Sequence, residues 1–328
     1  MSVKEDLTSL LEQSRGEFVS GEEIAQRLGC TRGAVWKAVR SLQDRGFSIE
    51  AVKNRGYRLA SDCDLLTAEG VKKYLESGAG ADVEVFDCVD STNNVVRRYA
   101  SEGAQEGKVV IAQRQTGGKG RLGRSFYSPP QTGLYMSFLL KPDMQVSQAV
   151  RITTCAALAV CDAVEQTTGQ KPAIKWVNDV YLNGKKICGI LTEASLSLEN
   201  GGVDYAVLGI GVNVYKPEEG FPAEIRDIAG AACANRQADL RNKLAAGIIN
   251  SFSHYYSDIR SGGFRDEYSR RLMWKGERIL MINGSRKTPC ILVDVDDECR
   301  LEVVLENGEH KLISSGEISI RRNSSSEE

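Results

Sequence analysis

Residues 107–142 contain no aspartate or glutamate, although the chain has 44 of them among its 328 residues. The apolar run at 108–113 predicts a strand, which leads into a glycine-rich segment at 115–124. Glycines allow tight turns and let backbone N–H groups approach a ligand. The cations of this acid-free stretch are Lys108, Arg114, Lys119, Arg121, Arg124 and Lys141. A strand that ends in such a loop predicts a folded domain with a site for a phosphate or a carboxylate.

Two common phosphate-binding motifs do not fit this loop. Its glycines Gly118, Gly120 and Gly123 have the spacing of the dinucleotide fingerprint. That fingerprint needs a helix directly after the loop and an acid roughly 20 residues further on. Here Ser125-Phe-Tyr-Ser-Pro-Pro130 follows, which cannot begin the helix, and no Gly-Lys-Ser/Thr ends the loop as in a Walker A motif. A solvated basic turn is the remaining alternative to an anion site.

A second candidate segment is the hairpin predicted by Asn183-Gly184, which lies between apolar runs. A two-residue turn there pairs Tyr181 with Lys186, and strand alternation puts Asp179 on their face. A lysine beside an acid fits two interpretations. One is a surface ion pair of little energetic value, and the other is a phosphate-binding lysine near a Mg²⁺-binding acid.

Two shorter patterns accompany these segments. Asp90-Ser-Thr-Asn93 follows a predicted strand at 83–89 and could simply cap a helix at 94–100. The predicted strand at 203–214 carries Gly209 and Gly211, which would leave one sheet face bare for a planar ligand.

The first sixty residues predict a separate unit with an uneven charge distribution. Residues 1–30 have a net charge of −3, from three cations and six acids, whereas residues 31–60 have +5, from seven cations and two acids. Such asymmetry indicates a face that meets an anion. The alternative is a domain used only for packing or protein contact.

The local pattern within this unit predicts a winged helix. Ser20 with Glu23 forms a capping box for a helix that ends at Gly29, and Thr31 caps a second helix. A strand at 47–52, a basic turn and a returning strand at 57–59 follow. Polar and basic residues on the second helix and the hairpin are suited to phosphates and base edges. The candidate DNA-binding residues are Arg32, Lys37, Arg40, Gln43, Lys53 and Arg55.

Composition limits the remaining classes. The net charge of −2 excludes a chain that is basic throughout, and the absence of ~18 consecutive uncharged apolar residues argues against a membrane span. Nine cysteines without a Cys-x-x-Cys pair indicate reduced thiols and a cytoplasmic protein. The two histidines, His254 and His310, are too far apart in sequence to favour a Ser-His-Asp triad or a histidine-based metal site.

The element pattern predicts an α+β, multidomain chain. Helices at 146–166 and 241–261 mix with hairpins without βαβ alternation. Beyond Trp274 the chain reads as all-β, with strands at 278–282, 290–295, 301–305 and 310–314, which predicts a small SH3-like β-barrel. The expected domains are 1–62 (winged helix), 63–272 (catalytic), 273–322 (barrel) and a disordered tail at 323–328.

Taken together, these pieces resemble the bifunctional biotin–protein ligases of the BirA-like type, which also act as biotin operon repressors. The resemblance runs along nearly the whole chain. The matching motifs are Asp90-Ser-Thr-Asn93, Gln115-x-x-Gly-Lys-Gly-Arg-x-Gly-Arg124, Lys175-Trp-x-Asn-Asp179, Lys186-x-x-Gly-Ile-Leu191, Gly209-x-Gly-x-Asn213 and Gly316-Glu317. Two positions depart from the family pattern. Lys119 stands where arginine is usual, which keeps the charge but loses the bidentate fork, and Val177 stands where proline is usual.

The resemblance implies a catalytic domain like those of class II aminoacyl-tRNA synthetases and a two-step reaction. Biotin and ATP would give biotinyl-5′-AMP, and a lysine of a biotin carrier domain, such as that of acetyl-CoA carboxylase, would then accept the biotin. Lys186, Arg121 and Asp179 are the implied catalytic residues, with Asp179 also near Mg²⁺. The implied biotin-binding residues are Ser91, Thr92, Asn93, Gln115, Gly118, Lys119, Gly120, Arg121, Lys186 and Gly189. Those implied for ATP and the adenylate are Lys119, Arg121, Arg124, Asn178 and Asn213.

The resemblance further implies that the adenylate acts as corepressor and promotes a homodimer that binds operator DNA. Three alternatives stay open. The winged helix could be a remnant on a ligase, the chain could be a biotin-sensing regulator without transfer activity, or it could be a sister ligase for another carboxylate such as lipoate. The cationic loop and Lys186 argue against the second alternative, and the fused winged helix argues against the third.

Overall fold

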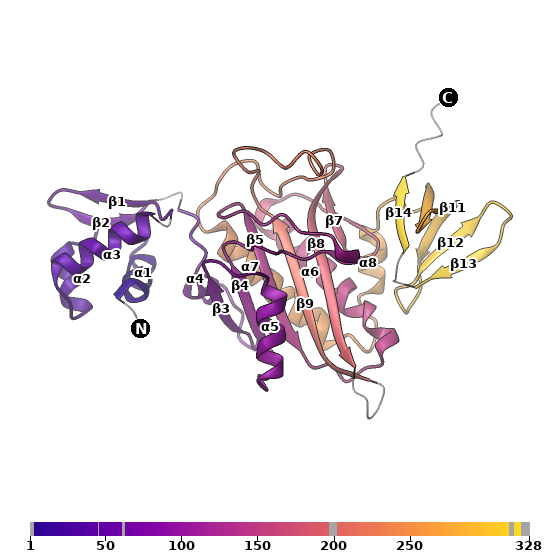
Figure 1. Ribbon diagram of the computed structural model, residues 1–328, viewed down its shortest axis with the longest axis horizontal. Helices are drawn as coiled ribbons and strands as arrows, with labels where there is room; N and C mark the ends of the chain where they lie inside the picture. Colours follow the sequence, from indigo (N-terminus) through magenta and orange to yellow (C-terminus); the bar gives the residue numbers. More distant parts are fainter. Residues whose placement is uncertain (1–2, 45, 61–62, 197–201, 315–317, 323–328) are drawn as a thin grey trace. The chain divides into compact units, whose positions relative to one another are not determined.

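The computed structural model describes residues 3–44, 46–60, 63–196, 202–314 and 318–322 (Figure 1). The chain divides into two compact units, the first made of residues 1–74 with 235–243 and the second of 75–234 with 244–328. The expected Gly316-Glu317 motif and the tail at 323–328 lie outside the described residues. The finer domain boundaries suggested by the sequence therefore stay predictions.

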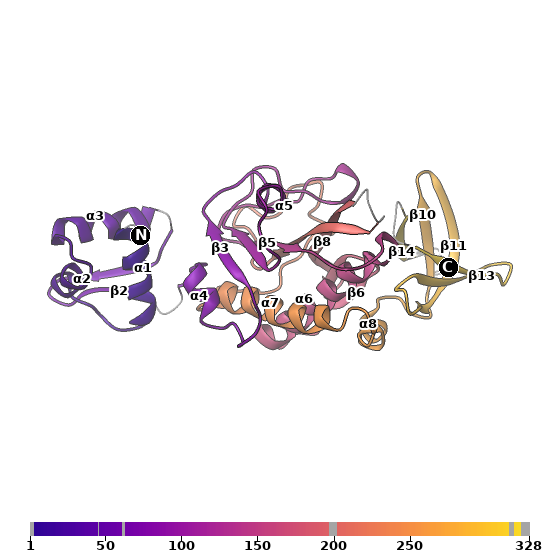
Figure 2. The same cartoon turned by 90° about the horizontal axis from the view of Figure 1, so that it is seen from below.

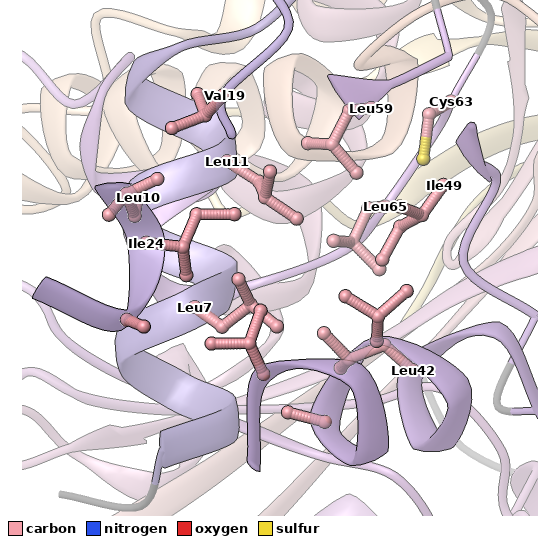
Figure 3. Close-up of a cluster of buried hydrophobic side chains, with 14 residues drawn as sticks. Leu7, Leu10, Leu11, Val19, Ile24, Leu42, Ile49, Leu59, Cys63 and Leu65 are labelled. Carbon is pink, nitrogen blue, oxygen red and sulfur yellow. The ribbon is translucent and has the colours of Figure 1, made fainter. Parts of the chain in front are cut away.

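The first unit contains a winged helix. Three helices precede a two-stranded antiparallel sheet, and a short helix follows it. These elements are α1 (Val3–Gln13), α2 (Gly21–Arg27), α3 (Arg32–Asp44), β1 (Ile49–Val52), β2 (Gly56–Leu59) and α4 (Ala68–Lys72). Figure 3 shows the apolar side chains that meet between them, among them the fully buried Leu7 and Ile24. Burial of each such side chain contributes about 1.5–3 kcal/mol, so this cluster is the main source of the unit's stability.

The cap of α2 is only half of the expected capping box. The Ser20 hydroxyl accepts a hydrogen bond from the backbone N–H of Glu23 at 3.1 Å, as predicted. The Glu23 carboxylate does not return to Ser20 in the described contacts; it pairs with Arg27 one turn later, at 2.6 Å. The exposed i, i+4 pair thus competes successfully with the reciprocal cap.

A buried polar cluster ties residues 235–243 to the rest of the first unit. The Arg241 guanidinium donates to the Asp64 carboxylate at 3.1 Å, and both side chains are almost completely buried. Arg15, which follows α1, donates to Asp239 at 3.3 Å. Buried charges are tolerated only when they are paired and hydrogen-bonded. These contacts therefore fix residues 235–243 in their position against Asp64 and Arg15.

The second unit is built on a seven-stranded mixed sheet in the order β3-β4-β5-β9-β8-β7-β6. Among the strand pairs of this sheet that the structure describes, only β3–β4 is parallel. The strands are β3 (Asp82–Phe86), β4 (Lys108–Ala112), β5 (Gly133–Leu140), β6 (Ala173–Lys175), β7 (Asp179–Leu182), β8 (Lys185–Leu196) and β9 (Val203–Asn213). This mostly antiparallel pairing confirms the α+β class and rules out a regular βαβ sheet.

Helices lie on both faces of this sheet. Figure 2 shows α5 (Thr92–Ser101) on one face, with α6 (Val150–Thr168) and α7 (Leu240–Ser257) on the other. The helix expected at 146–166 is interrupted, because a 3₁₀ turn at Val146–Gln148 precedes α6. The helix expected at 241–261 ends earlier, at Ser257. A further short helix, α8 (Arg265–Arg271), leads to the C-terminal strands.

The C-terminal part is an antiparallel sheet in the order β13-β12-β11-β10-β14. Its strands are β10 (Arg278–Asn283), β11 (Arg286–Val295), β12 (Leu301–Leu305), β13 (His310–Ile313) and β14 (Ile318–Arg322). All nine cysteines are free, and most of them are buried. No helix among the described residues is long and apolar enough to cross a bilayer.

Candidate active site

A cavity of the second unit lies over the middle of the mixed sheet and has a volume of about 530 Å³. Nearly all residues predicted for substrate binding line it, although they come from five separate parts of the chain. Those that line it are Ser91, Thr92, Asn93, Gln115, Lys119, Gly120, Arg121, Arg124, Asn178, Asp179, Lys186, Gly189 and Asn213. The structure therefore brings the sequence motifs together in one place.

The β7–β8 hairpin provides the centre of the site. Its register pairs Tyr181 with Lys186, as the Asn183-Gly184 turn predicts. The Lys186 ammonium lies 2.5 Å from the Asp179 carboxylate, and both side chains face the cavity. The pair is partly buried, at 28% and 19% side-chain exposure, which distinguishes it from a freely solvated surface pair. An incoming anion would therefore find an ammonium already positioned by the hairpin.

The glycine-rich loop brings its cations to the same cavity. Arg121 donates to the Asn178 side chain at 2.9 Å, and burial lowers the pKa of its guanidinium while Asp179 opposes that effect. Lys119 donates to the Asn94 side chain at 2.6 Å. Gly118 does not line the cavity; a Cβ there would lie 2.4 Å from the Phe126 carbonyl oxygen, so this glycine permits a close backbone crossing.

The two glycines of β9 do not leave the sheet bare, contrary to the expectation. A Cβ at Gly209 would lie 2.2 Å from Oδ1 of Asn93, and one at Gly211 would lie 2.6 Å from the Phe126 ring. The missing side chains make room for these two neighbours, and both glycines also line the cavity. Phe126 then becomes part of the cavity wall.

Several lining residues were missed from the sequence. Lys175 of β6 and Arg321 of β14 add two cations, and burial lowers the pKa of the Lys175 ammonium. Segment 224–229 also lines the site, because the backbone of Lys186 hydrogen-bonds to Ile228 and Gly230. Lys175 could have been suspected from its place at the start of the Lys-Trp motif. Arg321 could not, since it is over 130 residues from the hairpin in sequence.

The winged helix presents a basic surface of its own. Arg32, Lys37 and Arg40 are exposed on α3, as predicted. Trp36 lies among them and is 53% exposed, with the Arg40 guanidinium 5.6 Å from its ring centroid. An exposed aromatic among cations is an unusual feature for a packing surface and suits contact with nucleic acid.

Gln43, the other predicted residue of α3, is half-buried, and its role in DNA binding stays a prediction. Its amide nitrogen donates to the Ile49 carbonyl at 2.8 Å and so joins α3 to β1. In the hairpin, Lys53 and Arg55 are exposed, and the Arg55 guanidinium lies 4.2 Å from the centroid of the Phe18 ring. This stacking restrains the arginine side chain and leaves its positive charge available.

Comparison with protein families agrees with this arrangement. Residues 3–58 match a helix-turn-helix domain, residues 85–213 match the biotin/lipoate A/B protein ligase family, and residues 276–321 match the biotin protein ligase C-terminal domain. The fold and the cationic site thus define a carboxylate-activating protein ligase that carries a helix-turn-helix domain.

Similarity along the whole chain narrows this class. The chain is 33% identical over 325 residues to the bifunctional ligase/repressor BirA of Bacillus subtilis, which covers 96% of this chain and 98% of the relative. The corresponding protein of Bacillus spizizenii is 32% identical over 324 residues, with the same coverage. The structure of an Aquifex aeolicus biotin protein ligase in complex with biotin and ATP has 30% identity and a TM-score of 0.62, covering 74% of this chain and 99% of the other. The chain belongs to the family of BirA-type bifunctional ligase/repressors.

Proposed function

We propose that the chain is an ATP-dependent biotin–protein ligase that is also a biotin-responsive transcriptional repressor in the cytoplasm. The observation that carries the ligase assignment is the cavity in which Lys186 and Arg121 meet over the mixed sheet. Both reactants of the first step are anions. The positive side chains of a site that is partly shielded from water reduce the repulsion between them.

In the first step, a carboxylate oxygen of biotin attacks the α-phosphorus of ATP. The new P–O bond forms a mixed anhydride, biotinyl-5′-AMP, while the bond to the β-phosphate oxygen breaks and pyrophosphate leaves. Lys186 would hold the carboxylate against the α-phosphate, and Arg121 and Arg124 would neutralise the charge on the phosphates. Lys175 and Arg321 line the same cavity and would add to its positive electrostatic potential. Catalysis is then mostly positional and electrostatic.

The ureido end of biotin would lie against Ser91, Thr92 and Gln115, and the adenylate against Asn178 and Asn213. Asn93, Gly118, Lys119, Gly120 and Gly189 would complete the biotin site directly or through packing. These roles are proposals from the placement of the residues.

Magnesium would enter with ATP. Among the residues that the structure describes, no three metal-ligating side chains gather. Asp179 is hydrogen-bonded to Lys186, so it could offer at most a single carboxylate oxygen to the ion. Phosphate oxygens and water would supply the other ligands, which is the usual preference of Mg²⁺.

In the second step, the amine of a lysine on a biotin carrier domain attacks the carbonyl carbon of the anhydride. An amide bond forms, AMP leaves, and the amine loses a proton to solvent. The carrier domain of acetyl-CoA carboxylase is the proposed partner, because two similar proteins are named biotin–[acetyl-CoA-carboxylase] ligases.

The repressor role rests on the basic surface of α3 and the β1–β2 hairpin. The proposed domain boundaries are 1–62 for the winged helix, 63–272 for the catalytic domain and 273–322 for the barrel. Biotinyl-5′-AMP would promote a homodimer, and this dimer would bind a two-fold operator.

The test combines purified protein, ATP, Mg²⁺ and a carrier domain with either biotin or lipoate. Biotin should support pyrophosphate release and label the carrier, as read by streptavidin capture. If the carrier domain is modified with lipoate but not with biotin, the chain is a sister ligase. If biotin supports pyrophosphate release without labelling of the carrier, the chain is a sensor that does not transfer biotin.

A further inference from the structure

Among the described residues of the first unit, Trp36 on α3 is the most exposed large apolar side chain, at 53%. It is absent from the residues that form or cover the apolar core of Figure 3. Gly33 lies one turn earlier on the same side of the helix and has no side chain to cover the indole ring. A Cβ added at Gly33 would meet only one atom within 4 Å, the Thr31 hydroxyl oxygen at 3.9 Å. The fold of the unit therefore leaves the ring open to a partner from outside the chain.

Cations surround this ring. Arg32 and Arg40 lie one turn before and one turn after Trp36 in the same row of the helix, and Lys37 follows it directly. All three cations are exposed, and none of the described contacts pairs them with an acid. A protein partner would have to bring several carboxylates to this face, whereas a nucleic acid carries the complementary charge along its whole length.

Holding an arginine in place does not account for the exposed ring. Where the unit uses an aromatic ring in that way, at Phe18, the guanidiniums of Arg55 and Arg58 lie 4.2 and 4.5 Å from the ring centroid. Phe18 is also only partly exposed. At Trp36, the guanidinium of Arg40 lies 5.6 Å from the centroid, close to the ~6 Å limit of a cation–π contact. More than half of the Trp36 side chain remains exposed all the same.

The chemistry of an indole limits what it can contact on a duplex. It carries no charge and has a single N–H donor, so it cannot neutralise phosphates as the neighbouring cations can. It gains free energy mainly by burying apolar surface. In the major groove, which admits an α-helix, the apolar group that the base pairs present is the C5-methyl group of thymine.

We infer that Trp36 is a specificity-determining residue that contacts the C5-methyl group of a thymine in the major groove of the operator. Arg32, Lys37 and Arg40 supply the positive charge that holds the helix there. This inference rests on the proposed repressor function and deepens it, because it names the chemical group that one side chain of α3 reads.

The test uses the full-length chain with biotin and ATP, and a duplex selected by the wild-type chain from a random-sequence library. Each thymine of the selected half-site is replaced in turn by deoxyuridine in both half-sites, which removes only the methyl group. Fluorescence anisotropy measures the affinity. Replacement at one position should weaken binding about fourfold for each half-site, the effect expected for one buried methyl group. The other positions should show little change.

The Trp36→Ala variant shows which side chain makes this contact. It should bind the selected duplex at least ~10-fold more weakly, and deoxyuridine at the sensitive position should cause no further loss, because the two partners of one contact are not additive. The salt slope of its binding should stay at the wild-type value. Arg40→Ala should instead lower the salt slope by ~1 for each half-site and keep the sensitivity to deoxyuridine.

Val3→Ala is the matched control, because it removes another exposed apolar side chain of the first unit, on α1. It should bind the duplex like the wild type, and urea unfolding should give similar midpoints for Trp36→Ala and wild type. The inference is overturned if Trp36→Ala keeps the sensitivity to deoxyuridine. It is also overturned if this variant lowers the salt slope as Arg40→Ala does, since the ring would then only hold the arginine. Should Trp36→Ala not fold, a wild-type chain with no sensitive thymine overturns the inference by itself. A wild-type chain that selects no sequence from the library would instead refute the proposed repressor function.

Discussion

At the scale of the residue, the site depends on cations that neighbouring acids do not fully neutralise. Lys186 is paired with Asp179, whereas the described contacts of Arg121 at the cavity include the uncharged Asn178. Lys175 adds a half-buried ammonium whose pKa is lowered by desolvation. Such a site favours anions, because a bound anion compensates for the solvation that the partly buried cations have lost.

Replacement of Lys186 by alanine should slow adenylate formation by about 10²–10³-fold, because one charge that opposes the repulsion of two anions is lost. Pyrophosphate release in single-turnover conditions measures this step. Lys185→Ala is the matched control. Lys185 is the exposed neighbour of Lys186 and does not line the cavity, so this variant should retain activity. Comparable rates in Lys186→Ala and wild type would exclude the assigned role.

At the scale of the element, α3 combines two functions on two faces. Its buried face, which includes Val35 and Leu42, packs into the core of the winged helix. Its exposed face carries Arg32, Trp36 and Lys37. Because the faces are separate, the proposed DNA-binding side chains can be replaced without loss of the core.

The double variant Arg32→Ala/Lys37→Ala should abolish operator binding and leave ligation intact, because both side chains are exposed and lie far in sequence from the catalytic motifs. In the single variants, which should retain weaker binding, each lost phosphate contact should reduce the salt slope by ~1. Electrophoretic mobility shift and biotin transfer are measured on the same preparation. Lys4→Ala, an exposed cation on α1, serves as the control and should bind DNA normally.

The buried pair of Arg241 and Asp64 predicts a stability effect in the first unit. Asp64→Ala leaves a guanidinium without its carboxylate and should destabilise that unit by about 3–5 kcal/mol. By contrast, Glu23→Ala removes an exposed pair with Arg27 and should cost less than about 1 kcal/mol. Urea unfolding followed by circular dichroism distinguishes them. Similar midpoints for the two variants would contradict the importance of the buried pair.

At the scale of the whole molecule, the proposed function links ligation and repression through a shared intermediate, the adenylate. The winged helix offers few cations, and phosphate contacts weaken steeply with salt. One copy would therefore bind DNA weakly at physiological salt. A dimer doubles the contacts and matches a two-fold operator.

Addition of biotin and ATP together should increase affinity for an inverted-repeat operator and steepen its salt dependence if, as proposed, the adenylate promotes the dimer. Fluorescence anisotropy over a salt series, with sedimentation of the protein alone, measures both effects. Biotin or ATP alone is the control and should have little effect. Equal affinity with and without the adenylate would refute the corepressor role, and no specific binding in either state would favour a ligase with a remnant winged helix.

Local patterns in the sequence determined the elements and most of the site. The turn at Asn183-Gly184 needs positive φ at both positions, so its dipeptide alone predicted the register that pairs Tyr181 with Lys186. Alternation and charge likewise identified the winged helix and the cationic loop. These features depend on neighbours along the chain, which a sequence shows directly.

Tertiary structure decided what depends on distant neighbours. Gly209 and Gly211 look like a bare face in sequence, but Asn93 and Phe126 occupy that space. Arg321 reaches the cavity only because the C-terminal sheet lies beside it. Asn93 donates a hydrogen bond to Glu193, which is 100 positions away, and no local pattern in the sequence encodes this bond. Sequence patterns therefore determined which groups the chain carries, whereas packing determined which of them meet, because burial forces each polar group to find a partner wherever the fold places one.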